Sequence, residues 1–127
     1  MLTAKQMKIY IAGPYTAATE QQLEKNVNLA IDAAFVILEK GHFPFIPHLT
    51  HFVDKRANER GIKLTWEDYI RWDTVWAELC DALLYLGSSK GADLELKCAV
   101  RLGQTIYRSL DDIPSVTTET QKNVAEG

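Results

Sequence analysis

Cysteine is scarce in this sequence, and its placement limits the chemistry to be expected. The 127 residues include two cysteines, Cys80 and Cys98, which lie too far apart to form a Cys-x-x-Cys pair. Thiol redox chemistry and a cysteine zinc site are therefore not indicated. Both cysteines fall in predicted helices among apolar neighbours, where we expect free thiols that pack as small hydrophobic groups.

An excess of basic residues is also absent. The 14 Lys and Arg residues are outnumbered by 17 Asp and Glu residues, which gives a net charge of -3. A nucleic-acid-binding domain normally needs a clustered basic face to neutralise phosphates. The sequence therefore gives no indication of a nucleic-acid partner, although a few local donors would suffice for a small anionic ligand.

No hydrophobic run is long enough to span a membrane. The first residues, MLTAKQMKIYIAGP, contain an apolar core that is shorter than a signal peptide or a spanning helix requires. Hydrophobic residues at 46% and charged residues at 24% are typical of a globular domain. We therefore expect one cytoplasmic domain without a membrane partner.

The sequence does contain an alternation of strand and helix patterns. Such an alternation, with short connections, predicts an α/β domain with a four- to five-stranded parallel sheet covered by helices on both faces. The expected domain is 1–114, and a polar tail follows at 115–127. The expected strands are 7–13, 42–47, 81–87 and 105–108, the expected helices are 20–40, 66–80 and 91–103, and 48–64 is expected to be irregular with one helical turn near 51–58.

Three loops are expected to form a ligand site, because ligands of parallel sheets bind beyond the carboxyl ends of the strands. They are 13–19, 47–64 and 87–91. The first contains Gly13 and Pro14 in AGPYT. This motif is neither a GxGxxG nor a Walker loop, so a dinucleotide or a nucleoside triphosphate is not indicated. A simple turn explains its glycine and proline equally well.

The second loop contains His48 and His51 in PHLTHF. No third ligand lies at a suitable spacing, so we expect no metal site. We expect this loop, with His48, to help cover a bound base together with aromatic side chains. Aromatic residues at helical spacing are also common in cores, which is the alternative.

A carboxylate interrupts the apolar face of the helix expected at 66–80. Apart from Asp73, the residues at helical spacing on this face are largely apolar. An unpartnered buried carboxylate costs on the order of several kcal/mol, so Asp73 must line a cavity or find donors. We favour the cavity; loop capping or an ion pair with Arg71 or Arg101 is the alternative.

Glu95 shows the same anomaly near the start of the helix expected at 91–103, and unpaired helix amides there are expected to favour its ionised form. Two carboxyl groups that converge on one crevice favour cleavage of a glycosidic bond. An ion pair of Glu95 with Lys90 or Arg101 is the alternative.

The segment SSKG, before the same helix, predicts an anion site. Ser88 and Ser89 offer hydroxyl groups, and Gly91 allows a ligand to approach the free amides of the helix. Helix capping is an equally good explanation of the serines and is compatible with the first.

Together, the segments KIYIAGPYT, IPHLTHF, DTVWAELCDALLYL and SSKGADLELKCAVRLGQTIY resemble the nucleoside 2-deoxyribosyltransferase superfamily. The similarity spans the chain to about Pro114. It is strongest to a branch of small bacterial proteins of unknown function and to the 2′-deoxynucleoside 5′-phosphate N-hydrolases.

The resemblance implies a three-layer, flavodoxin-like (Rossmann-like) fold and a glutamate nucleophile that forms a covalent deoxyribosyl intermediate. Glu95 matches the nucleophile, Tyr15 the tyrosine that orients it, and Asp73 the aspartate beside the base. Ser89 stands where the transferases have an aspartate near the sugar 5′-hydroxyl and the nucleotide hydrolases have a serine that binds phosphate. Because a hydroxyl donates to phosphate and a carboxylate repels it, Ser89 favours a 5′-monophosphate.

We therefore expect an N-glycosidase of 2′-deoxynucleoside 5′-monophosphates that needs no cofactor or metal and assembles as a homodimer or higher homo-oligomer. A transferase that exchanges bases and a non-catalytic nucleotide-binding module are the alternatives. Addition of a second free base distinguishes the two reactions, because a transferase makes a new nucleoside whereas a hydrolase releases free sugar. Ligand binding without turnover would indicate the non-catalytic module.

Overall fold

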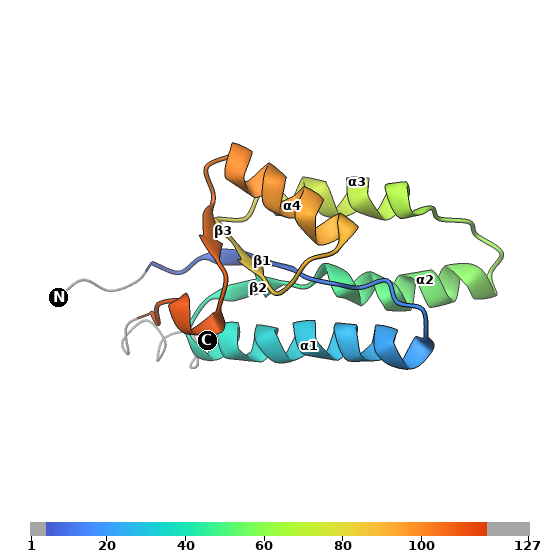
Figure 1. The fold of residues 1–127 in the computed structure, drawn as a ribbon, viewed down its shortest axis with the longest axis horizontal. Helices are drawn as coiled ribbons and strands as arrows, with labels where there is room; N and C mark the ends of the chain where they lie inside the picture. The colour runs from blue at the N-terminus through green and yellow to red at the C-terminus, as the bar shows by residue number, and fades with distance from the viewer. Residues whose placement is uncertain (1–4, 117–127) are drawn as a thin grey trace.

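A computed structural model describes residues 5–116 of the chain. Four parallel strands form one sheet in the order β2-β1-β3-β4. Helix α1 covers one face of this sheet and α3 and α4 cover the other (Figure 1). The expected three-layer α/β architecture is confirmed, with the flavodoxin-like strand order. The elements are β1 Lys8–Ala12, α1 Glu20–Glu39, β2 Phe43–Phe45, α2 Thr50–Glu59, α3 Trp66–Ala77, β3 Ala82–Tyr85, α4 Lys90–Arg101 and β4 Thr105–Tyr107, with short 3₁₀ turns at Pro47–Leu49 and Leu110–Asp112.

The central strand β1 is buried on both faces because its side chains alternate between two cores. Ile9 and Ile11 pack with the alanine-rich face of α1, whereas Tyr10 and Ala12 pack toward α3 and α4. All four side chains are fully buried. This alternation places one hydroxyl group, that of Tyr10, inside the second core.

The helices begin and end where the sequence supplies caps. Thr19 caps α1 by accepting a hydrogen bond from the amide of Gln22, and Thr65 and Asp68 form a complete capping box at α3. After α1 the chain reverses at Gly41, whose φ of 92° is accessible to glycine without strain. The caps therefore fix where α1 and α3 begin, next to the loops of the sheet edge.

The segment expected to be irregular, 48–64, is more regular than the sequence indicated. A 3₁₀ turn at 47–49 leads into α2, a helix of ten residues. The single helical turn predicted near 51–58 is thus a longer helix, and its length was underestimated because it buries only His51 and Ala57 and lacks an apolar stripe. Two of its polar residues, Thr50 and Asp54, line a cavity instead of a core.

The packed domain extends slightly beyond the expected boundary at 114. His42 accepts a hydrogen bond from the Met7 amide, and its Nε2 lies 2.6 Å from the Pro114 carbonyl oxygen. The Val116 amide donates to the Lys40 carbonyl, and Val116 is buried. The rest of the expected tail, 117–127, lies outside the described residues.

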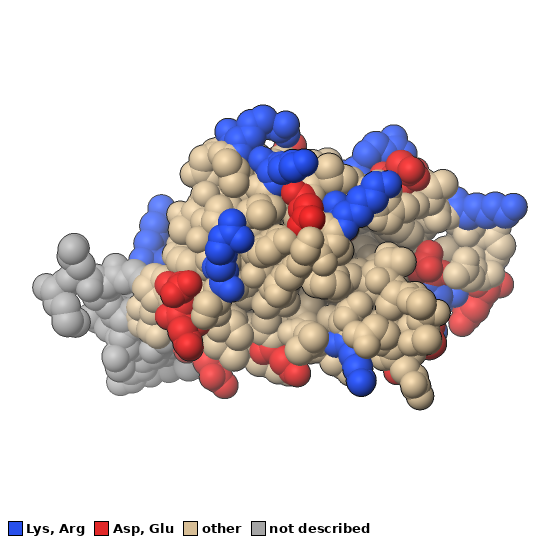
Figure 2. Space-filling model, viewed as in Figure 1, with Lys and Arg blue, Asp and Glu red and all other residues tan. Residues whose placement is uncertain are grey.

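Two surface properties bear on partners. Figure 2 shows basic side chains over α3 and α4 that are interrupted by acidic ones, without a continuous basic stripe on this face. Within residues 5–116, no helix is both long and apolar enough to cross a membrane.

Candidate active site at the carboxyl edge of the sheet

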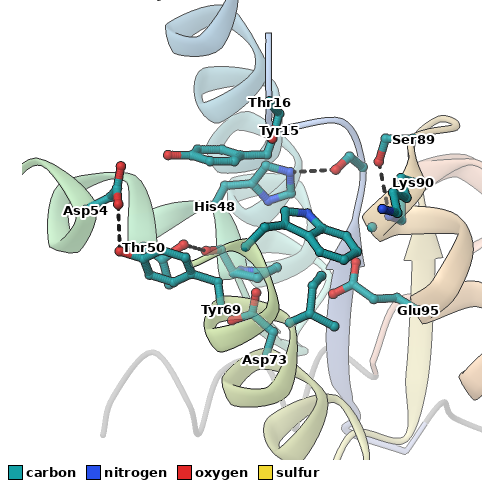
Figure 3. A pocket seen from close by; sticks show the side chains of 16 residues that line it. Tyr15, Thr16, His48, Thr50, Asp54, Tyr69, Asp73, Ser89, Lys90 and Glu95 are labelled. Atoms are coloured by element: carbon teal, nitrogen blue, oxygen red, sulfur yellow. Dashed lines mark hydrogen bonds between the residues drawn. The ribbon is translucent and has the colours of Figure 1, made fainter. Parts of the chain in front are cut away.

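A cavity of about 260 Å³ opens where the carboxyl ends of β1 and β3 meet α2, α3 and α4. This is the point of the sheet at which the strand order reverses, the usual ligand position in this architecture. Figure 3 shows its lining side chains, which converge from all of these elements. Seven of the nine predicted site residues line it: Gly13, Tyr15, His48, Asp73, Ser89, Gly91 and Glu95. Pro14 and Ser88 do not.

Asp73 lies on the face of α3 that lines the cavity, together with Trp66, Tyr69 and Ile70. Its side chain is buried, and no described residue donates a hydrogen bond to it. Neither alternative ion pair is formed, since Arg71 binds Asp68 and Arg101 contacts Cys98 Sγ. Burial raises the pKa of Asp73 to about 7, so this carboxyl group holds its proton close to neutral pH.

Glu95 lies on α4 and faces the same cavity (Figure 3). Burial raises its pKa to about 8, and the nearby charge of Asp73 acts in the same direction. The expectation that helix amides keep Glu95 ionised is therefore wrong. Glu95 lies beyond the first turn of α4, where the helix field has faded, and the loss of hydration outweighs it.

Tyr10 holds Glu95 in place. Its hydroxyl donates a hydrogen bond to Glu95 Oε2, which lowers the Glu95 pKa against the effect of burial. Burial also raises the pKa of Tyr10 far above its ordinary value, so the phenol remains a donor. Tyr10 was not among the predicted site residues, because a tyrosine within a buried strand has the pattern of a core residue.

Tyr15 lines the cavity but has a different partner from the one expected. Its hydroxyl lies 3.2 Å from His51 Nδ1, whereas the hydroxyl on Glu95 is that of Tyr10. The hydrogen bond to Glu95 that the resemblance implies for Tyr15 is therefore made by Tyr10 on β1. Tyr15 follows β1 in the loop that leads to α1, closer to α2.

The start of α4 supplies the hydrogen-bond donors of the cavity. Ser89 Oγ caps the helix by accepting from the Ala92 amide at 3.0 Å, which leaves its own proton available to a ligand. The amides of Lys90 and Gly91 have no acceptor within the helix. The Lys90 ammonium lies 4.5 Å from the centre of the Trp66 ring. This end of the cavity fits an anion.

Ser88 and Pro14 do not line the cavity and make local contacts elsewhere. Ser88 Oγ donates to Asp93 Oδ2 at 2.7 Å, outside the cavity. Pro14 packs beside Gly87, where an added Cβ would lie 3.5 Å from Pro14 Cδ. A side chain at Gly13 would approach Leu86 Cβ to 3.0 Å, so glycine allows the two strand ends to approach each other.

His48 presents an unsatisfied acceptor. Its Nε2 lies 3.1 Å from the Gly13 carbonyl oxygen, and burial lowers its pKa. The ring is therefore neutral, with its proton on Nε2 toward that carbonyl. His48 Nδ1 is the only buried side-chain nitrogen or oxygen of the described residues without a hydrogen-bond partner.

The loop 47–64 was predicted to form part of the site, but its side chains Thr50 and Asp54 were not singled out. Asp54 from α2 accepts a hydrogen bond from the Tyr69 hydroxyl at 2.9 Å. Thr16, Thr50 and Lys90 also line the cavity without having been singled out. A search for carboxylates spaced one helical turn from a loop histidine could have suggested Asp54. Among the described residues, no group of three or more His, Cys, Asp or Glu side chains could hold a metal ion.

The fold and the cavity define an α/β domain of flavodoxin-like topology with a cavity at the carboxyl edge of its sheet, where ligands of this architecture usually bind. Residues 7–109 match the model of a domain of unknown function, DUF7768. The chain belongs to this family. No curated protein matches the sequence.

Proposed function

We propose that the protein hydrolyses the N-glycosidic bond of 2′-deoxynucleoside 5′-monophosphates. The observation that carries this proposal is the pair of buried carboxyl groups, Asp73 and Glu95, which line one cavity and of which Asp73 raises the pKa of Glu95. Groups with such raised pKa values are typical of acid–base and nucleophilic sites. The donors at the start of α4 provide a place for the phosphate.

In the proposed first step, a Glu95 carboxylate oxygen attacks C1′ while the bond from C1′ to the base nitrogen breaks. The bonding electrons move to the base, which takes the proton of Asp73. In the second step, water attacks C1′ and gives a proton to the Asp73 carboxylate. The bond between C1′ and Glu95 breaks as the bond to water forms, and its electrons return to the Glu95 oxygen, which restores both carboxyl groups and releases 2-deoxyribose 5-phosphate. Atoms and charges balance without a cofactor or a metal.

The proposed function is tested by incubating the protein with a panel of deoxynucleotides and deoxynucleosides and separating the liberated bases. We expect base release from 5′-monophosphates and little from the matching nucleosides. Addition of a second free base should leave free sugar phosphate as the product. A new nucleotide carrying that base would instead show a transferase.

Ser89 is expected to determine the preference for phosphate. In Ser89→Asp we expect the ratio of kcat/KM for nucleotide to that for nucleoside to fall by about a hundredfold, because a carboxylate next to a phosphate dianion is repulsive. Ser89→Asn is the matched control, since asparagine and aspartate both cap helices well and only aspartate adds charge. An unchanged ratio of the two kcat/KM values in Ser89→Asp would show that the phosphate does not bind at the start of α4.

Tyr10→Phe should alter the pH dependence of the reaction. The productive form has one proton in the carboxyl pair, with Asp73 protonated and Glu95 ionised. Loss of the Tyr10 hydrogen bond raises the Glu95 pKa, so the population of this form falls. We expect the maximum of kcat/KM to fall roughly tenfold and the alkaline limb to move to higher pH. Tyr107→Phe, whose hydroxyl contacts Met7 Sδ on the other core, should leave the profile unchanged.

We also propose a homodimer that forms through α3. Trp72, Val75, Trp76 and Leu79 lie along one side of α3 and its end, and each is about half exposed. Trp76 stacks on Phe45 of the edge strand β2, with the ring centres 6.0 Å apart, so this apolar area continues onto the sheet. Two copies related by a two-fold axis would cover it on both chains. Sedimentation equilibrium is expected to give twice the chain mass of 14.3 kDa; a monomer at all concentrations would contradict this assembly.

A further inference from the structure

The two ends of the cavity have opposite hydrogen-bonding character. Figure 3 shows Ser89 and Lys90 on one side and Asp54 and Thr50 on the other, with His48 and Asp73 between them. The α4 end offers a hydroxyl proton, free amides and an ammonium group. The α2 end offers mainly hydrogen-bond acceptors, because most of its hydroxyl groups already donate their protons within the protein.

The hydroxyl protons at the α2 end are largely used within the protein. Tyr69 donates to Asp54 Oδ1 at 2.9 Å, and Thr50 donates to the Pro47 carbonyl at 2.9 Å. Tyr15 pairs with His51 Nδ1 at 3.2 Å. The Nε2 atom of His51 faces Glu20 at 3.9 Å, so a proton on Nε2 leaves Nδ1 to accept from Tyr15.

Asp54 is therefore a fixed acceptor in the cavity wall. A carboxylate has acceptor capacity on both oxygens, and Tyr69 occupies one position on Oδ1. No Lys or Arg of the described residues forms an ion pair with Asp54. His48 also lines the cavity, and its buried Nδ1 is a second acceptor without a partner among the described residues. Of the hydroxyl groups at this end, only that of Thr16 has no internal partner among the described residues and can donate or accept.

We propose that Asp54 selects bases that carry an exocyclic amino group, such as adenine and cytosine, over bases with an oxo group at the same position. This inference rests on the proposed function, in which the phosphate lies at the α4 end and C1′ lies beside Glu95. The base then extends toward α2. An amino group there donates to Asp54, whereas an oxo group meets a second acceptor and leaves both without a hydrogen.

Two pairs of nucleotides isolate this effect, because the members differ at a single exocyclic group and the adjacent ring nitrogen. They are dAMP with dIMP, and dCMP with dUMP. Binding is measured by titration calorimetry to the Glu95→Gln variant, in which the proposed turnover is blocked. We expect dAMP and dCMP to bind at least about tenfold more tightly than their oxo counterparts.

The same titrations on Glu95→Gln combined with Asp54→Asn are expected to show a ratio near one, because an asparagine amide can donate to an oxo group. Asp32→Asn, an exposed change on α1, is the matched control and should keep the preference. Equal affinities within both pairs, absence of binding, or a preference that survives Asp54→Asn would each overturn the role of Asp54. Base release by the unmodified protein from the same nucleotides tests the proposed function separately, since the dissociation constants do not depend on turnover.

Discussion

Glu95→Gln is expected to reduce base release by at least about a thousandfold, because an amide cannot form the bond to C1′ that the carboxylate forms. Glutamine has nearly the same shape and can still accept the hydrogen bond of Tyr10. The substrate should therefore still bind, and the loss should appear in kcat. Rates of base release at saturating dAMP or dCMP, followed by chromatography, measure it. Activity within tenfold of the unmodified protein would exclude Glu95 as the nucleophile.

Unfolding measurements distinguish this loss from damage to the fold. The pKa of Glu95 in the folded protein, about 8, lies above its ordinary value of 4.5. The folded state thus binds the proton of Glu95 more tightly than the unfolded state does. The resulting contribution to the free energy of unfolding is fully present below about pH 4.5 and is lost as the pH rises through about 8. Glutamine has no such titration. Glu95→Gln should therefore be at least as stable as the unmodified protein at pH 8, by thermal unfolding, and lower stability there would weaken the assignment.

Asp73→Asn is expected to lower kcat/KM by roughly a hundredfold to ten-thousandfold for natural bases, the usual contribution of a general acid. Asparagine cannot give a proton to the departing base. The loss should be much smaller for a 5′-phosphorylated deoxyriboside with a 4-nitrophenolate leaving group, which departs without protonation. Asp32→Asn makes the same chemical change at an exposed position of α1 and should have no effect. An equal loss for both kinds of leaving group would show that Asp73 does not act as the acid.

The pH profile provides a second signature of Asp73. With pKa values of about 7 and 8 for the two carboxyl groups, the unmodified protein should give a bell-shaped profile of kcat/KM with its maximum between them. In Asp73→Asn only Glu95 must lose its proton. The alkaline limb should therefore disappear, while the acid limb remains. A bell-shaped profile in the variant would mean that another group supplies the proton.

The sequence was sufficient to predict the architecture because β1, α1, β3 and α4 have clear apolar patterns and each is followed closely by a glycine. It also singled out Asp73 and Glu95, since each breaks an otherwise apolar helix face. Both are found at one cavity, because α3 and α4 pack on the same face of the sheet. The placement of Asp73 and Glu95 at one cavity was therefore predictable from the topology.

Other features depend on contacts that a linear pattern does not contain. Tyr10 has the spacing of a core residue, and only the packing of α4 across β1 brings its hydroxyl to Glu95. Ser88 and Ser89 are neighbours, yet successive side chains in extended backbone point in opposite directions, so only Ser89 reaches the cavity. Helix α2 was predicted only as one helical turn near 51–58, and Asp54 was not singled out, because a helix that buries so few residues shows little apolar periodicity.

In the proposed mechanism, Glu95 bonds covalently to C1′, and Asp73 first donates a proton to the base and then accepts one from water. Reaction of the Asp73→Asn variant with the 4-nitrophenyl substrate tests this mechanism most directly. Release of the nitrophenyl group needs no general acid, so the first step proceeds. The second step is slow, because the variant has no general base to activate water. We expect a burst of nitrophenol equal to the enzyme concentration, and mass spectrometry should find one deoxyribose phosphate on the peptide that contains Glu95. Steady turnover without a burst, or an adduct on another residue, would contradict the mechanism.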